Sequence, residues 1–516
     1  MAFNFNQYTN ATKIQIPKGI IHNGDFSNRF NNMTNLINCE LPNGITNMSG
    51  IFFNCFNLIE SPECGENTID MSNAYSYCYN ITGSPICGDS VINMSNAYSQ
   101  CYNLTGSPVC GNSVTNIAYA YANCRNINLP PACGDEVINM VGTYYNCTAI
   151  TGNPVCGNNV VDMTSAYGFC KNLTGTPVCG DKVINMNEAY QNCSSLTGSP
   201  VCGNLVTNIS GAYRNCTNLT GSPVCGDNVI RFSNTYAYCY NLTGSPVCGE
   251  KVASFIGTYN ECQNLTGNPI CGPNVTSMNY TYRYCNNLTG NPVCGNNVEY
   301  LIYAYYYCQK LTGSPVCGDN VIDMTSAYWS CKNLTGNPVC GSNVTNMSNT
   351  YARCSNLNGE PVCGALVINM ANTYLNCFNI VGSPVCGNNV TNMYRTYYYC
   401  RNITGSAVCG KNVKDVRMAY YECSNLSSNA YFFSNKITYV NNCFYGWNNS
   451  KRLRLYVHAD SNSFLTIKNG TSATNSIIGK AITWTDSGAN RIYNSLYNIY
   501  VYNVSNVAAN KAANGD

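Results

Sequence analysis

The sequence predicts a repeat solenoid of about 17 coils, each 23 residues long, followed by a small β-rich cap. The first observation behind this prediction is a fixed period. Residues 78–88 recur almost unchanged as residues 101–111, and the 23-residue step continues without a gap through most of the chain. Because a unit of this length cannot bury an apolar face alone, neighbouring units must stack and share one continuous core.

The cysteines supply the second observation, because nearly all of them lie on the same period. One series spans residues 55–423 with 17 members, another spans residues 64–409 with 16, and only Cys39 and Cys443 of the 35 cysteines fall outside both. A thiol packs well as a small apolar group, so we expect two stacked columns of reduced, structural cysteines. Disulfides between neighbouring coils remain the alternative, since the expected spacing lies within disulfide range. Representatives of the two columns are Cys78, Cys101, Cys124, Cys87, Cys110 and Cys133.

Each coil is expected to contain a short strand, a turn and a short helix or 3₁₀ turn. Apolar residues follow a helical spacing of three or four in Val91, Met94, Tyr98, Cys101 and Leu104. We therefore predict a helix or 3₁₀ turn over residues 95–101, with Ser95 as its cap. Residues 104–110 should be extended, because Pro108 disfavours the helical region for the residue before it.

The two ends of the repeat depart from its consensus. Residues 1–29 precede the first recognisable coil, and we interpret them as an attachment segment. Phe30 and Met33 take the places of the tyrosine and cysteine in the first coil, and Phe444 and Trp447 take them in the last. We expect the larger ring of Trp447 to close the core at the last coil.

The solenoid is accordingly predicted to span residues 30–447, and residues 448–516 to form the β-rich cap. Cysteine is absent from the cap. Residues 452–458 and 497–504 alternate between apolar and polar side chains, which is typical of half-buried strands.

Residues 44–58 read Gly-Ile-Thr-Asn-Met-Ser-Gly-Ile-Phe-Phe-Asn-Cys-Phe-Asn-Leu, and residues 343–357 repeat the design with tyrosine as the aromatic. This pattern resembles the BspA-like leucine-rich-repeat surface proteins. The resemblance covers about residues 30–447 and implies a right-handed, leucine-rich-repeat-like coil with an adhesive role. The sequence departs from that family by using tyrosine where phenylalanine is usual and by its recurrent Gly-Ser-Pro-Val-Cys-Gly turn. The segment after residue 447 also resembles terminal modules found in proteins of gut bacteria and their phages.

Composition argues against catalysis and against nucleic-acid binding. Charged residues make up only 10% of the chain and the net charge is +2, which excludes a strongly basic nucleic-acid binder. The two histidines, His22 and His458, lie near the ends, and no phosphate-cradling or His-Glu-x-x-His motif occurs. The alternating cysteine spacings of 9 and 14 lack the paired ligands of zinc sites. We therefore expect no enzyme, no cofactor and no bound metal.

Two polar columns have structural interpretations. At the second residue after the cysteines of the second series, carboxylates mostly alternate with Asn, as in Asp89, Asn112 and Asp135, which we interpret as solvated turns with calcium binding as the alternative. Asn-x-Ser/Thr sequences recur in nearly every coil, as at Asn93 and Asn103. We expect these asparagines to cap turns and stack their amides rather than carry glycans.

The pair of residues between the core tyrosine and the following cysteine varies from coil to coil and becomes aromatic toward the carboxyl half. These side chains should lie on the outward side of the predicted helix. Tyr and Trp combine a rigid apolar face with a polar group and are enriched at binding hot spots. Shielding of neighbouring coils is the alternative. The residues proposed to bind a receptor are Tyr238, Tyr284, Tyr306, Tyr307, Trp329, Tyr398 and Tyr399.

The leading functional hypothesis is a phage tail fibre or other virion appendage that contacts a host surface receptor, either a glycan or a protein. This hypothesis rests on the adhesive resemblance, on an amino terminus without a recognisable signal peptide, and on the lack of a membrane-spanning apolar run. Residues 1–29 would bind other virion proteins. The alternatives are a bacterial or protist cell-surface adhesin and a structural filament subunit, and self-association into a homo-oligomer stays open.

Overall fold

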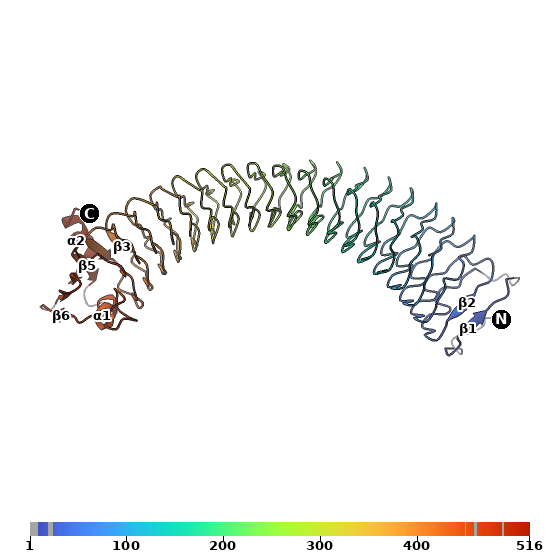
Figure 1. Cartoon of the computed structure of the whole chain (residues 1–516), viewed down its shortest axis with the longest axis horizontal. Coiled ribbons are helices and arrows are strands. Elements are labelled where there is room, and N and C mark those ends of the chain that lie inside the picture. Colours follow the sequence, from blue (N-terminus) through green and yellow to red (C-terminus); the bar gives the residue numbers. More distant parts are fainter. Residues whose placement is uncertain (1–8, 19–23, 449, 459–461, 488–489, 516) are drawn as a thin grey trace. The chain divides into compact units, whose positions relative to one another are not determined.

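The structure is a computed structural model that describes residues 9–18, 24–448, 450–458, 462–487 and 490–515. The chain forms two compact units, Met1–Ser254 with Thr258–Asn264, and Phe255–Gly257 with Leu265–Asp516. In Figure 1 each unit is a stack of similar coils, and the labelled strands occur only toward the two ends of the chain.

The first unit is held together by single parallel bridges between successive coils. They run from Asp25–Asn47 to Arg231–Ser254, and after the first of them every step is 23 residues. A short sheet pairs β1 (Lys13–Gln15) with β2 (Asn38–Glu40) in parallel. Regular stacking at the predicted period confirms the solenoid.

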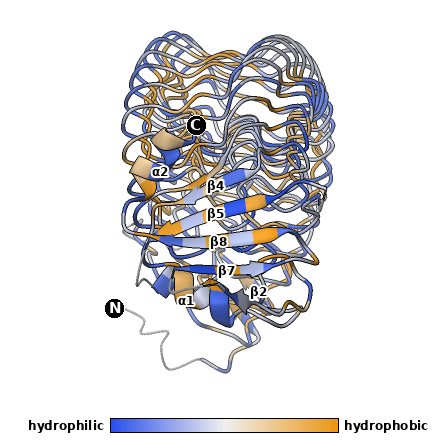
Figure 2. Cartoon of the chain, turned by 90° about the vertical axis from the view of Figure 1, so that its left-hand side faces the viewer, coloured by the Kyte–Doolittle hydropathy of each residue, from blue (hydrophilic) through white to orange (hydrophobic). Residues whose placement is uncertain are grey.

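The second unit continues the same pattern and ends in a larger sheet. Its bridges run from Ser277–Tyr300 to Asp415–Tyr439. The sheet has six strands in the order β3 (Ala407–Cys409), β4 (Asn429–Phe432), β5 (Leu453–His458), β8 (Ile499–Val504), β7 (Arg491–Asn494) and β6 (Thr485–Asp486). Two helices accompany it, α1 (Asn462–Asn469) and α2 (Val507–Ala513), as Figure 2 shows.

Strands β5 and β8 confirm the predicted strands over residues 452–458 and 497–504. Because β4 lies within the repeat and pairs in parallel with β5, the sheet continues across the predicted boundary at residue 447. The cap thus extends the last coils rather than forming a separate layer.

Of the two forms predicted for residues 95–101, an α-helix or a 3₁₀ turn, the structure has turns closed by bonds to the carbonyl three residues back, as at Ala97, Ser99 and Cys101. The amides of Met94, Asn96, Tyr98 and Gln100 donate to carbonyls of the next coil at 2.8 Å, while the intervening amides donate to the carbonyl three residues back. An α-helix needs every amide for bonds within the segment and a negative φ throughout. Here φ is +55° at Asn96 and +66° at Gln100. The segment is therefore a series of turns, which direct apolar side chains inward at nearly helical spacing. The side chain that caps it is Asn93, which accepts the Ser95 amide at 3.0 Å.

Proline explains why the extended stretch forms no sheet in the central coils. Pro108 has no amide hydrogen to donate to a neighbouring strand. Strand β3 appears where Ala407 takes the place of that proline, and β4, which follows one coil later, also lacks proline. The stretch therefore becomes a strand only where every residue can donate.

The core of each unit is a stack of aromatic rings, most of them tyrosines. Tyr98 and Tyr121 are stacked with centroids 5.8 Å apart and planes 3° apart, and comparable pairs extend along each unit. At one end Phe30 stacks on Phe52, and at the other Phe444 stacks on Tyr420. Together with Met and Val, these rings are almost completely excluded from solvent.

Each core tyrosine hydroxyl bonds to the backbone of the proline-containing stretch in its own coil. The Tyr121 hydroxyl donates to the Val109 carbonyl at 2.7 Å and accepts the Val109 amide at 3.0 Å. The same pair of hydrogen bonds recurs along the chain, from Tyr98, which bonds to Ile86, to Tyr420, which bonds to Val408. Tyrosine thus satisfies backbone groups that lack a sheet partner, which links the two departures from the BspA-like pattern.

Candidate recognition surface

The first cysteine series ties each coil to the preceding one. The thiol of Cys101 donates to the Tyr75 carbonyl at 3.1 Å, and Cys124 donates in the same way to Tyr98 at 3.0 Å. Cys78 is equally buried, and its thiol bonds to the Phe52 carbonyl. Burial raises the pKa of Cys101 and Cys124 well above the ordinary value. These residues are packing groups with a weak, directed hydrogen bond.

The second cysteine series is only half-buried from Cys64 to Cys386, and its last member, Cys409, is buried, so the expectation that both columns pack inside is wrong for Cys87, Cys110 and Cys133. Burial is still the main reason that the pKa of Cys87 is raised to about 12, and that of Cys133 also to about 12. A Cβ at Gly111 would lie 2.5 Å from the Gly88 carbonyl and 3.1 Å from the Cys87 sulfur, which is why glycine follows each cysteine. Both series are present as thiols in the structure.

High thiol pKa values change what the cysteines imply about location. The thiolate is the species that oxidises, and almost none of it exists at neutral pH when the pKa is near 12. Unpaired cysteines in these columns would therefore be chemically quiet even in an oxidising compartment. The cysteine content does not favour a cytoplasmic setting over an extracellular one.

The polar columns have the structural roles that the sequence indicates. Asn103 donates its amide to Asn80 at 3.4 Å, and Asn80 donates to Asn57 at 3.2 Å, which is a stacked amide ladder. Asn112 donates to the Asp89 carboxylate at 3.2 Å. Within the described residues, no group of three or more His, Cys, Asp or Glu side chains is arranged to hold a metal ion.

Four of the predicted receptor-binding residues meet in one cluster of the second unit. Tyr306 and Trp329 are stacked with centroids 4.5 Å apart and planes 6° apart. Tyr284 contacts both Tyr306 at 5.4 Å and Tyr307 at 5.3 Å. With their neighbours these residues form what we call the first aromatic stack: Tyr280, Arg283, Tyr284, Tyr303, Tyr306, Tyr307, Trp329 and Arg353.

Tyr398 and Tyr399 belong to another cluster of the same unit. Tyr398 stacks on Tyr421 at 4.5 Å, and Tyr421 stacks on Tyr445 at 4.4 Å. Arg395 lies 5.3 Å from the Tyr398 ring, and Arg401 lies 5.2 Å from the Tyr399 ring. We call this group the second aromatic stack: Arg395, Tyr398, Tyr399, Arg401, Tyr421 and Tyr445.

Tyr238 does not join either stack, because it lies in the first unit. It is half-buried, as are the other six predicted residues. A backbone feature is shared by Tyr238, Tyr284, Tyr307 and Tyr399, whose φ angles lie between +60° and +67°. Each of these residues immediately precedes a core cysteine, so the left-handed conformation belongs to the coil and not to the aromatic side chain.

Arginines are the members of this surface that sequence reasoning missed. The guanidinium of Arg353 lies 5.0 Å from the Trp329 ring, and that of Arg283 lies 4.6 Å from the Tyr284 ring. Arg283 and Arg353 occupy the same variable pair as the aromatic residues, which was the available signal. Cation–π contacts of this kind contribute about 0.5–1 kcal/mol at exposed sites.

The stacked geometry bears on whether the aromatic column binds a receptor or shields neighbouring coils. Trp329 lies between Tyr306 of the preceding coil and Arg353 of the following one, so both faces of its ring are covered. The rings thus shield one another between coils.

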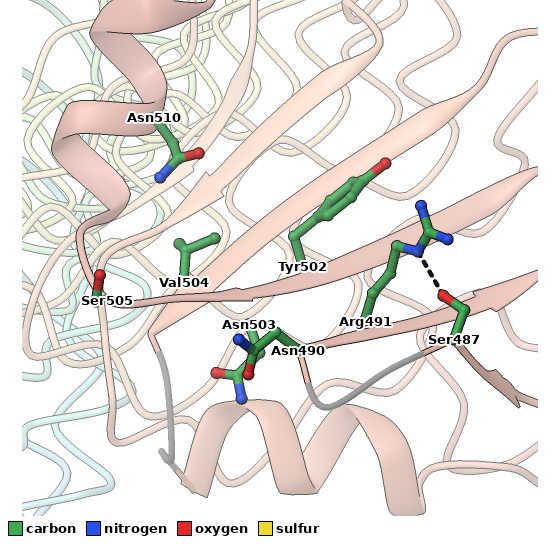
Figure 3. A pocket seen from close by; sticks show the side chains of 8 residues that line it. All are labelled: Ser487, Asn490, Arg491, Tyr502, Asn503, Val504, Ser505 and Asn510. Carbon is green, nitrogen blue, oxygen red and sulfur yellow. Dashed lines mark hydrogen bonds between the residues drawn. The ribbon is translucent and has the colours of Figure 1, made fainter.

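The sheet at the carboxyl end also carries an open pocket of about 610 Å³. Figure 3 shows its lining by Ser487, Asn490, Arg491, Tyr502, Asn503, Val504, Ser505 and Asn510. Arg491 is the charged member of this lining and donates to the Ser487 hydroxyl at 2.5 Å. No motif in the sequence indicated this pocket.

Two expectations fall wholly or partly outside the described residues. His22 and part of the attachment segment, residues 1–8 and 19–23, lie outside the described residues. In the part of the chain that is described, the helices fall short of the length and apolar character needed to cross a bilayer.

No protein-family model matches the sequence. No curated protein matches it either. The structure is similar to a leucine-rich repeat protein from Bacteroides ovatus, with 11% identity, 76% of this chain and 87% of that chain covered, and a TM-score of 0.31. It is similar to a leucine-rich cell surface protein from Faecalibacterium prausnitzii, with 13% identity, 74% and 87% covered, and a TM-score of 0.30. InlJ from Listeria monocytogenes, described as including a cysteine ladder, is 10% identical with 92% and 81% covered and a TM-score of 0.17.

Proposed function

We propose that the chain is a non-enzymatic recognition protein that acts as a cell-surface adhesin, with its aromatic stacks as the contact surface. The observation that supports this most directly is the concentration of rings and guanidiniums on one variable position of the coil in the second unit. Arg, Tyr and Trp are the residues most enriched at binding hot spots. The repeat lays them out as a row, which suits an extended partner.

The adhesin setting draws support from the BspA-like pattern of the repeat. Because their raised pKa values make the thiols unreactive, so many cysteines are compatible with a cell-surface setting. The description of the Faecalibacterium protein as a cell surface protein agrees with this proposal. A virion appendage would use the same surface, and that setting stays a prediction. A purely structural filament would not need a row of arginines and aromatic residues on one face.

Replacing Tyr306, Tyr307, Tyr398 and Tyr399 together with Ser tests the surface. We expect adsorption of the purified full chain to a panel of intact bacterial and epithelial cells to fall at least tenfold, because the rings and the arginines that lie on them are disrupted. Urea unfolding should change little, since these side chains are half-buried and outside the core.

The matched control replaces Tyr145 and Phe169, which occupy the same variable pair in the first unit and contact each other at 5.4 Å. Their replacement with Ser should leave adsorption unchanged. Equal loss in both variants, or no loss in the first, would contradict the assignment. Protease treatment of intact producing cells and peptide mass spectrometry of purified virions distinguish the two settings.

A further inference from the structure

Two neighbouring coils of the first unit bring a thiol and a thioether into direct contact. The Cys133 thiol donates to the Met140 sulfur with an S···S distance of 3.6 Å, and the Cys156 thiol donates to the Met163 sulfur at 3.6 Å. Both cysteines are half-buried, whereas both methionines are completely buried. Each sulfur pair therefore has one member in the core and one that solvent can approach.

The two pairs are neighbours because the coils stack. A Cβ at Gly157, the residue after Cys156, would lie 3.2 Å from the Cys133 sulfur. Burial is the main cause of the raised pKa of Cys133, and the neighbouring thiols Cys110 and Cys156 raise it further. The sulfur of one coil thus contacts the backbone of the next beside its cysteine.

A thiolate together with a thioether is a donor set for soft cations. Cysteine and methionine sulfur selects Cu(I), whereas structural zinc takes four ligands from cysteine, histidine and carboxylate. A d10 monovalent cation is satisfied by two or three sulfurs. With metal–sulfur bonds of about 2.3 Å, sulfurs 3.6 Å apart subtend an angle of roughly 100° at a shared ion. The two side chains therefore need to move little to hold one.

We propose that the Cys133–Met140 pair and the Cys156–Met163 pair each bind one soft monovalent cation, Cu(I) or Ag(I), between the two sulfur atoms. Binding forms a metal–thiolate and a metal–thioether bond, breaks the S–H bond of the cysteine and releases that proton to solvent. The charge of the cation cancels that of the thiolate, so no unpaired charge is buried beside the core. The site lies in the first unit, whereas the aromatic stacks lie in the second, and it does not depend on the proposed function.

The pKa of Cys133, raised to about 12, sets how binding depends on pH. Oxidation of a cysteine needs free thiolate, whereas a soft cation replaces the proton as the metal–sulfur bond forms. Because one proton leaves for each ion, the affinity should increase about tenfold for each unit by which the pH rises below that pKa.

Anaerobic titration of the full chain with Cu(I), in competition with a chromophoric Cu(I) chelator, tests the proposal. The variant Met140→Leu/Met163→Leu retains apolar side chains of similar volume, and circular dichroism checks that it folds. We expect this variant to lose two equivalents of tightly bound Cu(I) relative to the parent chain. X-ray absorption of the parent chain should show sulfur as the neighbour of the metal. Ag(I), which requires no reductant, should give the same difference of two equivalents.

The matched control is Ile117→Leu/Ile209→Leu, because these buried isoleucines occupy the methionine position in coils of the same unit that lack a thioether. Its tight binding should equal that of the parent chain. Equal loss in the control, no loss in the methionine variant, or unfolding of the parent chain on adding two equivalents would overturn the proposal. An affinity that does not change between pH 6 and pH 8 would also overturn it, because no proton would then be displaced.

Discussion

The central and terminal coils satisfy the same backbone in different ways. In a central coil Pro315 precludes a strand and the Tyr328 hydroxyl bonds to the Val316 amide and carbonyl. In the terminal coils that contain β2 and β4 a strand pairs the backbone and the core ring is phenylalanine, whereas the coil of β3 lacks proline but keeps Tyr420, whose hydroxyl bonds to the Val408 amide and carbonyl. In the central coils the phenolic oxygen and the proline therefore form a matched pair.

The positions of the phenylalanines support this comparison. Phe52 lies twelve residues after Glu40, and the Glu40 carbonyl already accepts the Ile16 amide at 3.1 Å in the sheet of β1 and β2. Phe444 lies thirteen residues after Tyr431, which is the register partner of Val408 and pairs with both β3 and β5. A hydroxyl at either ring would meet backbone that is already bonded. Phenylalanine therefore accompanies β2 and β4, where strand pairing occupies the backbone groups.

The largest expected effect is a loss of stability of the central coils at alkaline pH, because their buried cysteine thiols titrate there. Burial raises the pKa of Cys354 from about 9 to about 12, as it does for Cys147 and Cys239. Below pH 9 these thiols are protonated in both states. Above pH 9 the unfolded state releases protons that the folded state retains, so stability falls as pH rises, by about 1.4 kcal/mol per pH unit for each such cysteine.

Urea unfolding followed by circular dichroism at pH 8 and pH 10, with reductant present, measures this. The urea midpoint should drop sharply at the higher pH and recover when the sample is returned to pH 8. An unchanged midpoint would mean that the thiols are not buried in the central coils.

A smaller effect should follow from exchanging the two kinds of ring. Tyr328→Phe leaves the Val316 amide and carbonyl without their partner and should lower the free energy of unfolding by about 1–3 kcal/mol. Phe52→Tyr should also destabilise by about 1–3 kcal/mol, because it buries a hydroxyl beside backbone that is already paired. Urea titration measures both. If the two changes are neutral, the matched pair of proline and tyrosine does not govern the coil.

The smallest effect should come from the thiol bond between coils. Cys331 donates to the Tyr305 carbonyl at 3.0 Å. Cys331→Ser retains a donor and should cost less than about 1 kcal/mol, whereas Cys331→Ala loses the donor and leaves a small void, at about 1–2 kcal/mol. The order of the two variants in urea unfolding is the test. Greater loss in the serine variant would show that apolar packing outweighs the hydrogen bond.

The sequence predicts the period, the core and the cap strands because each depends on patterns that repeat. Tyr98 is recognisable as a core residue from its spacing alone. Its bond to Ile86 is not, because that contact depends on where the backbone of the extended stretch points. The spacing cannot distinguish an α-helix from turns, because turns with positive φ at Asn96 and Gln100 also place apolar side chains inward at nearly helical intervals.

The candidate surface is predictable to a similar degree. Aromatic enrichment identifies Tyr306 and Trp329 as neighbours on one column, since a fixed period brings equivalent positions together. The part played by Arg353 could not be read from the sequence, because stacking depends on the side-chain conformation that its neighbours allow. For the same reason the covered ring faces were not foreseen.

The residue before each core cysteine keeps a left-handed backbone conformation whatever its side chain is. Gln100, Tyr307 and Arg353 share that conformation although their side chains have nothing in common. Glycine there would relieve roughly 1–2 kcal/mol of backbone strain in each coil, yet most coils keep a larger side chain. One surface position per coil can therefore be changed, by mutation or by design, without altering the scaffold that displays it.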